Sequence, residues 1–470
     1  GYSKAFEDFK GNENSKYRIL RSKNPYGAYG DSPIWTGTYV ASLAFHYGEA
    51  CEEKDVSEVN EVLNKMISPV NGLHVLTHVS GLEGNLARWA VKDTPKNRER
   101  FEGYFYKHED GKLVKKEANL EDRRYPGQGN YSDWIYEDDT SRDQHIGYFM
   151  GYGIAYKILT ETDAPTGINL SLKQKIVQTI KQDCLEVLDR LLGSGWDVIA
   201  GESKKGEGRG NDGASFYPRF PWEGGGTYLL AYTSLGKMMN PQKYTKYHEE
   251  AVNKYLTTSY HFTVAQQSSS YFGNNLAMEG FLLQYFLEED LDLKEKIRYQ
   301  FNKFFYKNVQ YHRNCWFNLG YLIINELELD EILQNDRLTY RLDDIVDNMR
   351  RFAEWRFPAR EWHVPVPEDA EDLVHPKRDT YADVFNEESS HPLNMLYGAL
   401  IRELADTERK SRVALGIDEL KATGFAWQSS PFSLTGNFPE NENALGYEQN
   451  PGVDFLVCYW LGRYYGYFNS

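Results

Sequence analysis

The sequence contains few cysteines, and their spacing excludes the sites that cysteines usually build. Among 470 residues there are four, Cys51, Cys184, Cys315 and Cys458, and none forms a CxxC pair or another metal-ligand spacing. Cys184, Cys315 and Cys458 fall inside apolar helical patterns, where free thiols are commonly buried. We therefore expect buried free thiols and no disulfide framework.

Long apolar runs and the common cofactor motifs are also absent. No apolar run reaches the roughly 18 residues that a membrane-spanning helix needs, so we expect no such segment. The sequence lacks HExxH, GxSxG, a dinucleotide-binding glycine fingerprint and zinc-ligand spacing. These absences disfavour metalloproteases, α/β-hydrolases and dinucleotide enzymes, and we expect a site without a metal ion or cofactor.

Charge and aromatic content favour another class of ligand. The formal net charge is −16, and a field of that sign repels nucleic acid and anionic lipid headgroups. The chain also has 35 Tyr, 24 Phe and 10 Trp, and the flat faces of Tyr and Trp suit stacking on sugar rings. Nucleic acid is therefore a poor partner, whereas a carbohydrate partner becomes a hypothesis.

Helical periodicity runs through most of the chain. Apolar residues recur at spacings of three and four in 35–50, 58–68, 146–160, 172–192, 226–238, 275–288, 294–306, 315–328, 339–353, 393–404 and 455–465. Long connections rich in Gly, Pro, Trp and acids separate some of them, at 101–141, 194–225, 357–390 and 424–452. We predict an all-α fold of paired helices in a ring, an (α/α)6-type toroid formed by one domain over 1–470. A small β-hairpin is expected within 101–118, around an Asp-Gly turn.

The densest polar segment, WIYEDDTSRDQHIGYF at 134–149, precedes a predicted helix. Its acids can simply cap that helix, and a calcium loop fits only loosely. Alternatively they supply the two carboxyl groups that glycoside hydrolysis needs, one protonated and one ionised. Asp139 and Asp143 are four residues apart and would share a face if both are helical, with Arg142 and His145 beside them.

Five other segments supply further candidates. The Gly-rich segment 207–228 places Trp222 beside Glu223, although a tight loop before a helix explains it equally well. A lyase needs a neutraliser such as Asn or Arg and a base such as His or Tyr. Residues of these types lie in 74–89, which is expected to form a Gly-punctuated turn, and at 271–275 and 311–318, which open helices. An isolated His or Asn at a helix start is also a common cap; the lyase candidates are His78, Asn275 and His312. Trp427 lies in a loop that could close over the ring.

Three stretches carry a resemblance to a known group of proteins. DDTSRDQHIGYFMGYGIAYKIL, HVSGLEGNLARW and NPGVDFLVCYWLGRYYG resemble secreted proteins of the six-hairpin, (α/α)-toroid glycosidase-like superfamily. The resemblance implies a single toroid, a periplasmic or cell-surface location, and activity on glycans by hydrolysis or β-elimination. The chain opens without an initiator Met or a signal peptide, and we expect that an export signal has been removed.

The leading hypothesis is a monomeric glycoside hydrolase acting on a poly- or oligosaccharide. Asp139 or Asp143 would be the acid or base, with Glu223 as partner. The aromatic side chains that would stack on sugar are Trp134, Tyr136, Trp222 and Trp427. The polar side chains that would orient its hydroxyls are Arg142, His145 and Asn275. Two alternatives stay open: a polysaccharide lyase using His312 or His78, and a glycan-binding protein without catalysis.

Overall fold

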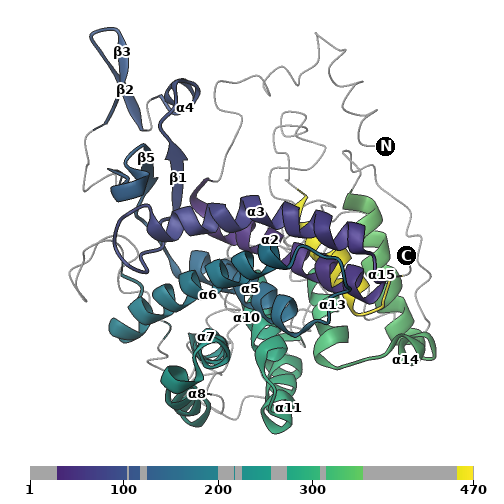
Figure 1. Cartoon of the computed structure of the whole chain (residues 1–470). Coiled ribbons are helices and arrows are strands. Elements are labelled where there is room, and N and C mark those ends of the chain that lie inside the picture. The colour runs from purple at the N-terminus through teal and green to yellow at the C-terminus, as the bar shows by residue number, and fades with distance from the viewer. Residues whose placement is uncertain are drawn as a thin grey trace, which may run out of the picture.

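The computed structural model describes residues 29–102, 105–116, 124–199, 216, 225–255, 272–306, 314–352 and 452–468. Within these residues the chain is mostly helical, with two small antiparallel sheets at one end (Figure 1). The predicted mainly helical class is confirmed at this level. None of the helices in these ranges is long and apolar enough to cross a membrane.

Ten of the eleven segments predicted from apolar periodicity coincide with helices, and the other one, 393–404, lies outside the described residues. The main helices are α2 (Ser32–Glu52), α3 (Val56–His78), α4 (Pro95–Arg100), α5 (Arg142–Glu161), α6 (Leu170–Gly193), α7 (Gly225–Met239), α8 (Pro241–Tyr255), α10 (Phe272–Leu287), α11 (Leu291–Gln300), α13 (Cys315–Ile324), α14 (Leu329–Leu333), α15 (Asp336–Phe352) and α19 (Val453–Tyr464). A π-helical segment, η4 (Phe301–Tyr306), extends α11, and the short 3-10 helices are η2 (Tyr29–Asp31) and η3 (Gly129–Tyr131).

Helix α3 continues ten residues beyond the end of its predicted segment, 58–68, which ended before Pro69. Proline removes one backbone hydrogen bond and disfavours a helix interior. The helix nevertheless continues to His78, because Val70, Leu73 and Leu76 bury their side chains beyond the proline. Core packing therefore overrides the local signal, and it places residues 74–78 on a helix rather than in a turn.

The strands form two separate sheets. The predicted hairpin is confirmed as β2 (Tyr106–Glu109) and β3 (Lys112–Lys115), whose turn residues Asp110 and Gly111 both have positive φ. A second sheet has the order β1 (Trp89–Lys92), β5 (Trp134–Glu137), β4 (Arg124–Pro126). Sequence periodicity did not predict it, because strands of three or four residues are too short to show alternation.

The helices share one large core. Helix α2 packs against α3, α5 and α19, while α10 packs against α5, α7 and α13. Helix α19 is joined to α2 by Arg463, whose guanidinium lies 2.7 Å from Glu49 and 2.9 Å from Glu53. The beginning and end of the described chain are therefore packed together. All four cysteines are buried free thiols, as predicted.

Candidate functional site

The polar segment before α5 divides at the start of the helix. Ser141 is the N-cap residue, and its backbone N–H donates to Gln144 Oε1 at 2.9 Å. Helix α5 therefore begins at Arg142, with Asp143 in its first turn and Asp139 outside it. Asp139 and Asp143 were expected to share a helix face if both were helical; this condition is not met, because the cap fixes the start of the helix between them.

Asp138 and Asp139 are held by the loop that follows α3. Asn85 Nδ2 donates to Asp138 Oδ1 at 2.9 Å, and both side chains are buried. Arg88 Nη1 donates to the backbone oxygen of Asp139 at 2.9 Å and lies 3.7 Å from its carboxylate. These contacts join the two loops and give both acids a structural role, whereas Asp143 lies in the first turn of α5.

Three carboxyl groups converge from three helices at the position of Asp143. Glu279 comes from α10 and is 1% exposed, and Asp454 lies in the first turn of α19 with no exposed surface. The charges of Asp143 and Asp454 both act on Glu279, and α10 packs against α5. Residues more than 130 positions apart in the chain thus form one acidic cluster, which we call the acid recess.

The environments of Glu279 and Asp143 shift the pKa values of the two carboxyl groups to different extents. Burial, reinforced by the charges of Asp143 and Asp454, raises the pKa of Glu279 well above its ordinary value. Burial also raises the pKa of Asp143, and Asp31 adds to this, but Arg142 and Arg88 oppose it. Burial and neighbouring charge therefore favour the protonated form of Glu279 more strongly than that of Asp143.

Neutral polar side chains line the same recess. Asn275 lies one turn before Glu279 on α10 and has no exposed surface. Among the described residues, neither atom of its amide nor the hydroxyl of Tyr232 has a hydrogen-bond partner. Leaving such a group unpaired in the interior costs about 1–3 kcal/mol. Unpaired groups beside a carboxyl cluster therefore indicate a place where a polar ligand binds.

Sequence reasoning found part of this recess. Asp143, Arg142 and Asn275 were predicted, whereas Glu279, Asp454 and Tyr232 were missed. One signal was present, because Glu279 is a lone acid inside the apolar run LAMEGFLLQYFL and lies four residues after Asn275. A single charge on an apolar helix indicates either a buried pair or a site.

The predicted sugar-stacking residues on β5 lie in the small sheet. Tyr136 is buried, with its ring 5.7 Å from that of Tyr125. Trp134 is half-buried and meets Tyr131 edge-on at 6.4 Å between ring centroids. Both rings thus pack within the fold. The remaining predicted site residues, Trp222, Glu223, His312 and Trp427, lie outside the described residues.

His145 is buried beside the recess rather than open to a ligand. Its Nδ1 lies 2.8 Å from the backbone oxygen of Ser141, and its ring packs near Phe149 and Phe216. Burial lowers the pKa of His145 to about 4. Its ordinary value is about 6.5, so the unfolded chain takes up a proton first as the pH falls.

We therefore expect His145 to make the protein acid-sensitive. As the pH falls from 6.5 to 4, His145 should lower the free energy of unfolding by about 3 kcal/mol, because each unit of pKa shift corresponds to roughly 1.4 kcal/mol. His145→Gln should flatten this dependence, which urea unfolding at pH 7 and pH 4.5 would measure. His108→Gln, at an exposed site on β2, is the matched control. Equal pH dependence in His145→Gln and the wild type would contradict the assignment.

Comparison with known proteins gives no family. No protein-family model, no curated protein and no solved structure matches the chain. The function is therefore argued from the acid recess itself.

Proposed function

We propose that the chain is a glycoside hydrolase in which Glu279 is the acid and Asp143 is the base or nucleophile. Glycoside hydrolysis needs one protonated and one ionised carboxyl group on either side of the scissile bond. The observation that supports this is the unequal pair of carboxyl groups, in which burial and the charge of Asp143 raise the pKa of Glu279 well above its ordinary value. Asp143 was predicted for this role, and Glu223 stays a prediction.

The recess contains the groups for each step. Glu279 would transfer its proton to the glycosidic oxygen as the bond to the anomeric carbon breaks. In direct hydrolysis, a water oxygen would bond to that carbon while the water loses its proton to Asp143. In the alternative route, Asp143 would first form a covalent glycosyl intermediate, and water would then displace Asp143 and lose its proton to the Glu279 carboxylate. The amide of Asn275 would bind a sugar hydroxyl, and the charge of Asp454 would help to keep the proton on Glu279.

The helix contacts support a toroid around this recess. The contacts pass from α2 to α5, then through α7 and α10 to α13, and from α13 to α19, which packs against α2 again. Asp143, Tyr228 and Asp454 lie in the first turns of α5, α7 and α19. We propose that the inner helices form a ring and that the first turns of α5, α7 and α19 lie on one side of it. A carbohydrate polymer as substrate, with a periplasmic or cell-surface location, is consistent with it.

A polysaccharide lyase is the second candidate, because Asn275 and Tyr232 are of the types that β-elimination uses. Their unpaired amide and hydroxyl could neutralise a uronic acid and remove the adjacent proton. Burial raises the pKa of Tyr232 well above its ordinary value, however, and this opposes its use as a base. Hydrolysis is therefore favoured over elimination.

A glycan panel with two variants tests the proposal. The wild type should release reducing ends from at least one glycan, and Asp143→Asn should lower kcat by roughly 100-fold or more, because it removes the ionised group. Asp163→Asn, at an exposed position after α5, is the matched control and should retain activity. An unsaturated product that absorbs in the near ultraviolet would identify a lyase instead. Saturable binding without any product would identify a glycan-binding protein, and full activity in Asp143→Asn would remove this residue from the site.

A further inference from the structure

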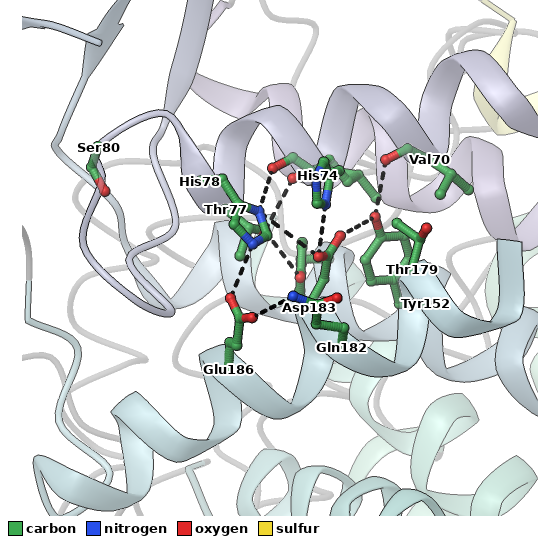
Figure 2. A network of polar contacts seen from close by, with 12 residues as sticks. Val70, His74, Thr77, His78, Ser80, Tyr152, Thr179, Gln182, Asp183 and Glu186 are labelled. Carbon is green, nitrogen blue, oxygen red and sulfur yellow. Dashed lines mark hydrogen bonds and ion pairs between the residues drawn. The ribbon is translucent and has the colours of Figure 1, made fainter. Parts of the chain in front are cut away.

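Two histidines of α3 face two acids of α6 in a second polar cluster (Figure 2). His74 and His78 are four residues apart, and Asp183 and Glu186 are three apart, so each pair lies on one face of its helix. The two imidazole centroids are 4.1 Å apart. Figure 2 shows Asp183 and Glu186 pointing across the helix interface toward these rings. We call this group the histidine–carboxylate cluster.

The distances in the cluster match those around a small metal ion. Asp183 Oδ1 lies 2.8 Å from His74 Nδ1 and 3.8 Å from His78 Nδ1. Ligand atoms at about 2.0–2.1 Å from a tetrahedral ion are about 3.3 Å from one another, a value between these two distances. One ligand atom from each of the three residues lies within 4.8 Å of the other two. Small side-chain rotations would therefore bring the three atoms around one ion.

Tyr152 and Glu186 orient the side chains of the three potential ligand residues. The hydroxyl of Tyr152 lies 3.2 Å from Asp183 Oδ2, which leaves Oδ1 toward the histidines. Glu186 Oε2 lies 3.0 Å from His78 Nε2, which leaves Nδ1 of that ring toward Asp183. Carboxylates that hold the far nitrogen of a ligating histidine fix its tautomer and strengthen its metal bond. The cluster thus has the outer partners of a metal site as well as the ligands.

The burial of Asp183 and the types of donor atom favour a transition-metal ion as the ligand of this cluster. The Asp183 side chain has no exposed surface, while 34% of His74 and 24% of His78 is exposed, so an ion can approach past the rings. A buried carboxylate is costly unless a cation accompanies it. Two imidazole nitrogens and one carboxylate oxygen suit Zn²⁺ and its neighbours, whereas Ca²⁺ and Mg²⁺ prefer oxygen ligands alone.

We propose that His74, His78 and Asp183 bind one divalent transition-metal ion of the zinc class, which ties the end of α3 to α6. When the ion binds, His78 Nδ1 gives up its hydrogen bond to the backbone oxygen of His74, at 2.9 Å, and becomes a ligand of the ion. A fourth position on the exposed side of the rings is open to water. The sequence did not predict this site, because residues 74–78 were assigned to a turn and the HxxxH spacing has its meaning only on a helix.

Metal titration of the full chain tests the proposal. The protein is treated with a chelator, dialysed, and titrated with Zn²⁺ by calorimetry and with Co²⁺ by visible absorption. We expect one tight ion per chain and a Co²⁺ band in the visible range. His78→Ala should abolish both signals, and Glu186→Gln should weaken binding roughly 10- to 100-fold, the usual effect of losing an outer carboxylate.

The choice of variants separates the site from folding defects. His78 is partly exposed, so His78→Ala removes a ligand without leaving a new unpaired charge on that helix. His108→Ala removes another histidine paired with a carboxylate, His108 with Glu102 at 3.2 Å on the surface, and should bind the metal as the wild type does. No saturable Zn²⁺ binding in the wild type, or equal binding in His78→Ala, would overturn the proposal.

Discussion

Glu279→Gln is expected to lower kcat by roughly 10²- to 10⁴-fold and, at the same time, to raise the free energy of unfolding at pH 7. The loss of activity follows from removing the proton donor, and its size is that of general acid catalysis. The gain in stability follows because the folded protein holds a buried carboxyl group beside Asp143 and Asp454. Glutamine has nearly the same shape and carries no ionisable proton.

The pH dependence gives the sign of the stability effect. The pKa of Glu279 is higher in the folded than in the unfolded chain, so the folded state holds a proton that the unfolded state has released. The contribution of Glu279 to wild-type stability therefore falls as the pH rises above about 4.5, the range where unfolded Glu ionises. Urea unfolding at pH 5, 6, 7 and 8 should show the stability of Glu279→Gln exceeding that of the wild type by an increasing amount.

Glu288, directly after α10, provides a matched control for this variant. Its carboxyl group is also buried, yet His248 at 3.4 Å and the backbone N–H groups of Glu289 and Asp290 lower its pKa despite burial. Glu288→Gln should therefore lose stability at pH 7, the opposite sign. If Glu279→Gln also lost stability, Glu279 would be a paired structural acid like Glu288, and its catalytic role would be refuted.

The helices could be predicted from the sequence, whereas the acid recess could be predicted only in part. Apolar periodicity located α6, which buries one stripe of side chains, and also α2 and α5, which are buried on most of their sides. Asp143 was found because it lies in a visibly charged segment. Glu279 and Asp454 are single acids on apolar helices, and only tertiary packing brings them to Asp143.

The histidine–carboxylate cluster was not predicted from the sequence, for a different reason. Local rules end a helix before a proline, and Pro69 therefore hid the helical spacing of His74 and His78. The partner acids lie more than 100 residues later in the chain, on α6. Neither half of the cluster carries a signal that a sequence pattern can detect without the helix packing.

Gly147→Ala should strongly destabilise the protein, because α2 and α5 touch through their backbones. A Cβ on Gly147 would lie 2.4 Å from Ile34 Cα, and one on Gly37 would lie 1.9 Å from Gly147 O. A flexible side chain could move aside from such a contact, but backbone atoms cannot move without separating the helices. Overpacking commonly costs 1–3 kcal/mol, and here we expect about 3 kcal/mol or more.

Urea unfolding of Gly147→Ala and of Gly72→Ala would measure this effect and its control. Gly72 is exposed on α3, and nothing lies within 4 Å of the position that a methyl group would take there, so alanine should add about 0.5–1 kcal/mol through helix propensity. Gly147 lies one turn after Asp143, so forcing α5 away from α2 would also displace the proposed base from Glu279. Stability and activity should therefore fall together in Gly147→Ala, whereas they change in opposite directions in Glu279→Gln. An unchanged unfolding midpoint in Gly147→Ala would contradict the close α2–α5 contact on which the placement of Asp143 depends.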